Sequence, residues 1–116
     1  MIVAVQGTSN FNDYNVFLRA MGVALSSLPE GDTDFIIASA GPLRINQMAT
    51  EFSNVSERGL KARGIKNKVI KVPPTWIKDN IHSIGYFAYF SKPKEPVSSL
   101  VDLAEAKDVE VGVYRY

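Results

Sequence analysis

Cysteine is absent from the sequence. Its absence excludes disulfide bonds, thiolate metal ligands and a thiol nucleophile, and it agrees with a reducing interior. The net charge is also small, because 13 lysines and arginines nearly balance 12 aspartates and glutamates. A formal charge of +1 argues against a strongly electrostatic partner such as duplex DNA. We therefore do not expect nucleic acid as a partner.

Long apolar runs and sorting signals are missing as well. No run approaches the ~20 residues that cross a bilayer. The first residues lack the basic start and small-residue cleavage site of a secretory signal. These absences predict a cytoplasmic protein without a membrane partner.

Several catalytic signatures are absent too. The sequence contains no Gly-x-Gly-x-x-Gly, no Gly-Lys-Ser/Thr loop and no Gly-x-Ser-x-Gly elbow. His82 is the only histidine, and no carboxylate cluster surrounds it in the sequence. Asp32 and Asp34 are close together, but no metal-ligand spacing continues from them. We predict no catalytic residue, no bound metal and no cofactor.

What the sequence does contain is the composition of one globular domain. Its 116 residues are 46% hydrophobic and 22% charged, enough to build one core and too few for two. Residues 1–116 are therefore predicted to be a single domain.

Residues 2–13 show a pattern of strand, turn and helix start that recurs along the chain. The apolar, uncharged run Ile2–Val5 indicates a strand buried on both faces. Gly7 allows a tight turn, Thr8 and Ser9 place hydroxyl and N–H groups at the end of the strand, and Asn12 or Asp13 can cap a helix. In parallel α/β sheets, ligands bind at this end of the strands.

The pattern then repeats along the chain. Phe35–Ala38 is a second apolar run, and it ends in a small polar turn before Pro42, which suits a first helical position. Apolar spacing and turn residues predict the other elements. Helices are expected over 13–28, 42–63 and 97–104, and strands over 68–72, 85–90 and 109–113; residues 75–84 fit either a short helix or an ordered loop.

Strands that alternate with helices predict right-handed crossovers and a mainly parallel sheet. The strands at 68–72 and 109–113 alternate in character and suit edges, whereas the continuous apolar strands suit the middle. The expected fold is a single doubly wound, Rossmann-like, three-layer α/β domain. Its five strands should follow the order 3-2-1-4-5, with the switch point between strands one and four.

Two glycine-containing turns also resemble a known family. Residues 7–13, Gly-Thr-Ser-Asn-Phe-Asn-Asp, are similar to the Gly-Ser-Arg-x-Phe-x-Asp motif of small single-domain SLOG proteins, which are Rossmann-like and occur in bacteria and phages. Residues 39–46 lie where that family has a second motif, close to Ser-Gly-Gly-Ala-Arg-Gly-Ala-Asp. Residues 86–113 resemble the family's closing strand, helix and valine strand.

The resemblance implies binding of a nucleotide or nucleotide derivative across these turns, as a sensor or accessory protein more than as an enzyme. Any enzymatic reaction would be hydrolysis of such a ligand, in a bacterium or a phage-infected cell. The residues that the resemblance assigns to ligand binding are Gly7, Thr8, Ser9, Phe11, Ser39, Gly41, Arg44 and Asn46.

The sequence also departs from the family. Ser9 replaces the arginine of the first motif, and Ala40 and Leu43 replace a glycine and an arginine of the second. The Arg-Asn-x-x-Met segment has no counterpart between Pro73 and Ile84, and Pro96-Val97 replaces a Gly-Thr pair. These losses motivate an alternative function, an interaction or assembly subunit without a ligand, such as a phage accessory or structural protein.

Two further features bear on partners. The basic run of Lys61, Arg63, Lys66, Lys68 and Lys71 could contact an acidic partner, but lysines also protect an edge strand from unwanted pairing. Tyr114 and Tyr116 favour a self-association surface, so a homo-oligomer is also expected.

Overall fold

Strands and helices alternate along the chain, as the repeated apolar runs predict. The computed structural model describes all 116 residues. The elements are β1 (Ile2–Gly7), α1 (Tyr14–Ser26), β2 (Asp34–Ser39), α2 (Leu43–Ala62), β3 (Lys66–Lys71), α3 (Pro74–Asp79), the 3-10 turn η1 (Ile81–Ser83), β4 (Ile84–Ser91), α4 (Ser99–Ala106) and β5 (Glu110–Arg115).

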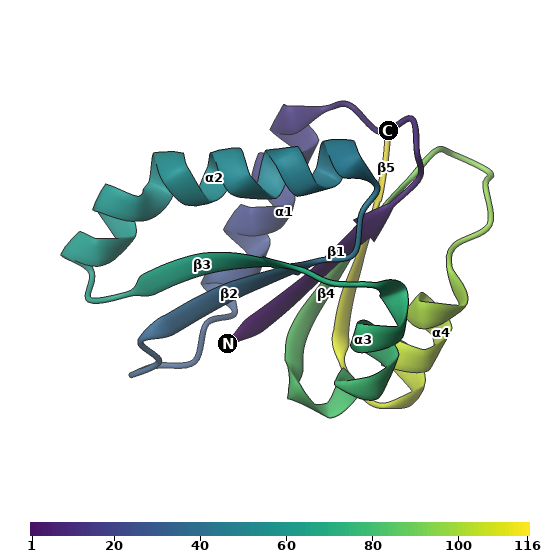
Figure 1. Cartoon of the computed structure of the whole chain (residues 1–116). Helices are drawn as coiled ribbons and strands as arrows, with labels where there is room; N and C mark the ends of the chain where they lie inside the picture. Colours follow the sequence, from purple (N-terminus) through teal and green to yellow (C-terminus); the bar gives the residue numbers. More distant parts are fainter.

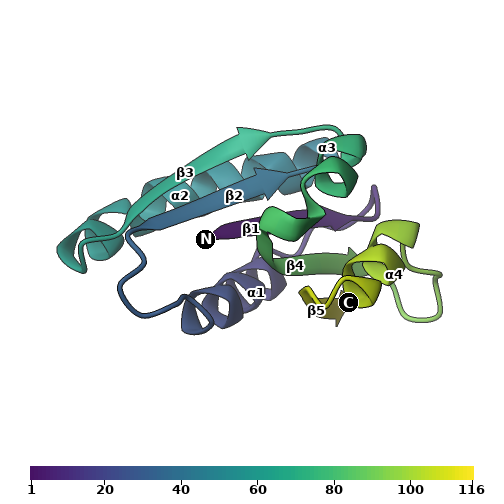
Figure 2. The ribbon, with the colours of Figure 1, turned by 90° about the horizontal axis from the view of Figure 1, so that it is seen from below.

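The five strands form one sheet in the order β3-β2-β1-β4-β5, and every neighbouring pair is parallel (Figure 1). Helices α1 and α2 cover one face, while α3 and α4 cover the other (Figure 2). This arrangement confirms the predicted three-layer, doubly wound α/β fold and its strand order. It places the carboxyl ends of β1 and β4 at the switch point.

Two apolar cores lie on the two faces of the sheet. The larger core packs the aromatic and aliphatic side chains of α1 and α2 on β1, β2 and β4, and the smaller core lies under α3 and α4. The aromatic strand β4 is buried at every position except Gly85. This burial confirms that its aromatic residues are core side chains.

Some element boundaries differ from those predicted. Residues 75–84, where the sequence favours neither helix nor loop, form α3 and η1. The sequence predicts Pro42 at the first helical position, whereas α2 begins at Leu43 and Pro42 is the residue before it. Asp13 caps α1 by accepting a hydrogen bond from the Val16 N–H at 3.2 Å, which leaves Asn12 free for another contact.

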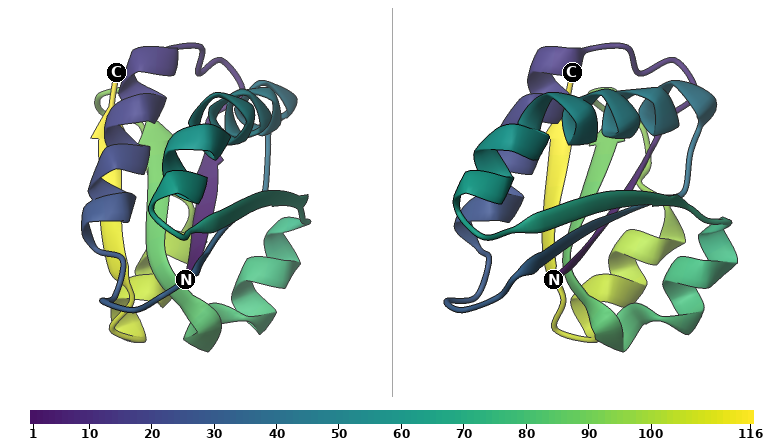
Figure 3. Two further views of the ribbon diagram at one scale, coloured as in Figure 1. Left: turned by 90° about the vertical axis from the view of Figure 1, so that its left-hand side faces the viewer. Right: turned by 60° about the vertical axis from the view of Figure 1, so that its left-hand side comes forward.

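The strand β5 also corrects a prediction. Its alternating sequence predicts buried valines and a solvated face that carries Tyr114. In the structure Tyr114 is half-buried: its ring stacks on Phe90 at 5.5 Å and its hydroxyl group hydrogen-bonds to Tyr86. Val113, by contrast, is 37% exposed. The reason is that α1 lies against one face of β5 (Figure 3, left), and Tyr114 packs on the core formed with α1 and α2.

No helix combines the length and the apolar character that a membrane span requires.

Candidate functional site

The turn between β1 and α1 closes tightly against its neighbours. The Thr8 N–H donates to the Phe90 carbonyl at 2.9 Å, which joins the turn to β4. At Gly7, a Cβ atom would lie 2.6 Å from Ile45 Cδ1 and 2.8 Å from the Phe90 carbonyl oxygen. Glycine is therefore required here because α2 and β4 approach the backbone on both sides, which leaves no room at Gly7 for a ligand.

Phe11 fills the space above the ends of β1 and β4. Its side chain is only 1% exposed, and its ring stacks on Phe90 with centroids 4.5 Å apart. Tyr116, directly after β5, packs its ring at a tilt against Phe11, with centroids 4.8 Å apart. The crevice in which parallel α/β proteins bind ligands is thus occupied by aromatic side chains of the chain itself.

The hydroxyl group of Tyr116 also satisfies the polar groups of this turn. It donates a hydrogen bond to Asn10 Oδ1 at 2.7 Å, and it is hydrogen-bonded to the Thr8 hydroxyl. Side-chain groups that could bind a phosphate or a ribose therefore have a partner within the chain. Ser9 remains exposed, with its side chain in neither interaction.

The turn between β2 and α2 lies beside the first turn. Ser39 is fully buried, and its hydroxyl donates to the Asn46 side chain on α2. Gly41 has a φ of +85°, a backbone conformation that favours glycine. This turn therefore uses its small residues mainly to form the connection.

Arg44 connects the two turns. Its Nε–H donates to Asn12 Oδ1 at 2.6 Å, across 32 residues of sequence. The structure thus brings the eight residues of the predicted ligand site to the same edge of the sheet. Of these, Phe11 and Ser39 are buried, and Arg44 is already paired.

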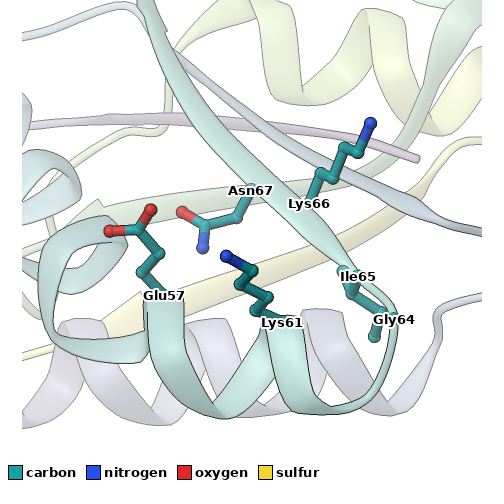
Figure 4. A pocket seen from close by; sticks show the side chains of 6 residues that line it. All are labelled: Glu57, Lys61, Gly64, Ile65, Lys66 and Asn67. Carbon is teal, nitrogen blue, oxygen red and sulfur yellow. The ribbon is translucent and has the colours of Figure 1, made fainter.

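The surface also has four hollows, and only one of them reaches this edge, at Asn46. The first has a volume of about 450 Å³ and lies between the end of α2 and the start of β3. Figure 4 shows Glu57 and Lys61 on either side of the Asn67 amide, while Lys66 points away. Opposite charges line this hollow, so it does not select for an anion. The Nδ2 group of Asn67 is buried there without a hydrogen-bond partner.

The other three hollows are lined by few hydrophobic residues. One of about 560 Å³ lies where α1 and α2 end, one of about 440 Å³ runs along α2 and includes Asn46, and one of about 380 Å³ lies over β2 and β3. Of the eight predicted ligand residues, only Asn46 lines any of these four hollows. No local sequence pattern indicates these hollows, since each combines residues of at least two elements or connecting loops.

The rest of the surface offers little catalytic chemistry. No three His, Asp or Glu side chains are grouped so as to hold a metal ion. His82 is exposed on η1. Burial, together with the neighbouring Tyr114 hydroxyl, raises the pKa of Tyr86 far above its usual value, which moves this group away from acid or base chemistry near neutral pH.

The sequence did not indicate that the residues near the end of the chain also hold a neighbouring loop. Arg115 Nη1 donates to Ser91 Oγ at 2.9 Å and to the carbonyl oxygens of Lys92 and Glu95 at 2.9 and 2.8 Å. These bonds attach β5 to the loop that leads into α4. No local pattern predicts them, because the partners come from different segments.

No family model, curated protein or solved structure matches this chain. The SLOG resemblance of the two turns stays a prediction that rests on the sequence alone.

Proposed function

We propose that this protein is an interaction or assembly subunit built on a Rossmann-like fold, and that its crevice holds its own side chains in place of a ligand. One observation carries the proposal: the ring of Tyr116 packs at a tilt against the buried ring of Phe11, and its hydroxyl group hydrogen-bonds to the first turn. The departures of the sequence from the SLOG motifs point the same way.

The contacts of Tyr116 set an energetic cost for a ligand that displaces it. An aromatic pair contributes about 0.5–1.5 kcal/mol beyond the burial of its surface, and a hydrogen bond contributes a net ~0.5–1.5 kcal/mol. A ligand that enters beside Phe11 has to replace both contributions of Tyr116. The cost of a few kcal/mol weakens such a ligand by about two orders of magnitude.

The experiment that tests this proposal is a thermal-shift series with nucleotides and ADP-ribose derivatives. The wild-type protein is expected to keep its Tm with every compound, since no binding stabilises the native state. The same thermal-shift series is then measured on the variant Tyr116→Ala, which lacks the ring that covers Phe11. A Tm increase of the wild-type protein that saturates with one compound contradicts the proposal.

The second candidate function is binding of a small nucleotide-like molecule at the two turns. The pairing of Arg44 with Asn12 favours it, since a guanidinium between two turns can exchange its amide partner for a phosphate. If this candidate is correct, the wild-type protein gains stability with one ligand, and Arg44→Ala abolishes the gain. Overnight incubation and product analysis then distinguish a sensor from a hydrolase.

A further inference from the structure

The two edges of the sheet differ in how they are protected. At the β3 edge, lysines occupy three of the six positions of the strand, KNKVIK. Such lysines prevent an edge strand from pairing with another chain. The β5 edge, EVGVYR, has neither lysine nor proline. The sheet therefore has one protected edge and one open edge.

From this asymmetry we propose that β5 pairs antiparallel with β5 of a second copy of the chain, about a two-fold axis at Val113. The result is a homodimer with a continuous sheet through both copies. This inference rests on the proposed function as an interaction subunit. It identifies β5 as the interacting surface and a second copy of the chain as the partner.

The backbone of β5 presents free hydrogen-bonding groups in the right positions. The Tyr116 N–H donates to the Ser91 carbonyl at 3.2 Å, so it points toward β4. Along a strand, successive residues direct these groups to opposite sides, so Val111, Val113 and Arg115 direct theirs outward. An antiparallel copy centred on Val113 places these outward residues opposite one another, where they can exchange hydrogen bonds.

Between the exposed, charged residues Glu110 and Arg115, this edge has one exposed apolar side chain, that of Val113. Val113 is 37% exposed on one face of the sheet. On the other face, Ser27 at the end of α1 donates to Glu110 Oε1 at 3.4 Å, which places this side of α1 along β5. Val23 lies one helical turn before Ser27 on the same side and is 38% exposed. The two-fold axis therefore places Val113 of one copy against Val113 of the other. It also turns the side of α1 that carries Val23 toward α1 of the second copy.

The charges of β5 are compatible with a second copy. Glu110 and Arg115 are its only charged residues, and they lie at opposite ends of the strand. Antiparallel pairing places the Glu110 end of one copy beside the Arg115 end of the other. Like charges therefore do not face each other, so a second copy of the strand meets no charge repulsion along this edge.

The test is the mass of the full chain in solution, measured by light scattering from about 10 μM to about 1 mM, a range that covers weak dimers. The wild-type protein is expected to approach twice the chain mass of 12.8 kDa as the concentration rises. Val113→Lys places two ammonium groups at the axis and is expected to weaken dimerisation at least tenfold. Val55→Lys is the matched control, because Val55 is 73% exposed on α2 away from the edge.

Amide hydrogen exchange gives an independent measurement on the wild-type protein. The Val111, Val113 and Arg115 amides are expected to exchange slowly at high concentration and fast at low concentration. If Val113→Lys does not fold, this exchange measurement on the wild-type protein tests the dimer on its own. A monomer mass for the wild-type protein over the whole range overturns the inference, and so does a dimer that Val113→Lys leaves unchanged. Neither result bears on the thermal-shift test of the crevice, so the two proposals fail separately.

Discussion

The ring of Tyr116 lies 4.8 Å from the ring of Phe11, although 104 residues separate the two in the sequence. This contact joins the last strand to the first turn of the fold. It places an aromatic side chain where a doubly wound protein holds its ligand. The predictions below follow from this contact and from the packing around it.

Removal of the Tyr116 side chain is expected to destabilise the protein. Tyr116→Ala loses the tilted ring contact with Phe11 and the hydroxyl bonds, which predicts a loss of about 1–3 kcal/mol in the free energy of unfolding. Tyr116→Phe keeps the ring and is expected to lose ~0.5–1.5 kcal/mol. Urea unfolding measures both variants. Unchanged stability in Tyr116→Ala refutes the packing role of this residue.

Glycine at position 7 is expected to be indispensable for packing. A methyl group there meets Ile45 Cδ1 at 2.6 Å and the Phe90 carbonyl oxygen at 2.8 Å, and the backbone oxygen cannot move away. Gly7→Ala should therefore lower the unfolding free energy by about 1–3 kcal/mol. Gly22→Ala is the control: its position on α1 is open, so it should stabilise the helix by about 0.5–1 kcal/mol. Equal effects at the two positions argue against a tight turn at Gly7.

Alkaline pH is expected to destabilise the fold through Tyr86. Burial raises its pKa in the native state above the value of about 10 that applies to the unfolded chain. A raised pKa contributes stability below pH 10, and this contribution is lost as the pH rises above 10, because the unfolded chain releases the proton first. Unfolding curves between pH 8 and about 11.5 measure this slope. Tyr86→Phe should flatten it, and an equal slope in both proteins speaks against the assignment.

The lysines of β3 are expected to prevent association at the second edge. Replacement of Lys66 and Lys68 by threonine removes their charges from this edge and keeps the strand propensity. If β5 forms the dimer, an unprotected β3 allows dimers to join edge to edge and form open chains. Light scattering of the double variant should then show masses above the dimer. Replacement of Arg58 and Lys61 by glutamine on α2 is the control, and a double β3 variant that stays at the wild-type mass contradicts the role of the lysines.

Much of the fold was predictable from the sequence, because its cause is local. The continuous apolar runs at Ile2–Val5 and Phe35–Ala38 can be buried only in the middle of a parallel sheet. The alternating strand that carries Lys68 and Lys71 can only lie at an edge. These patterns favour the order 3-2-1-4-5 over most others, and the structure confirms this order.

The contents of the crevice were not predictable, because they depend on contacts between distant segments. Nothing near Phe11 in the sequence indicates that Tyr116 covers its ring, and nothing near Arg44 indicates a bond to Asn12. The alternation of β5 likewise misplaced Tyr114, since the sequence does not say which face α1 covers. Ser9 and Gly41 lie in the turns as predicted, whereas Gly7 and Ser39 are the last residues of β1 and β2. The role of these residues toward a ligand stays a prediction.

The most direct test of the central claim is a nuclear magnetic resonance titration of the wild-type protein with ADP and ADP-ribose. Backbone amide signals of Thr8, Asn10 and Arg44 report on the crevice. The filled crevice predicts that these signals keep their positions up to millimolar ligand, and that the Tyr116 ring shows cross-relaxation with the Phe11 ring throughout. Saturable shifts of these amides, with loss of the contact between the two rings, would contradict the account.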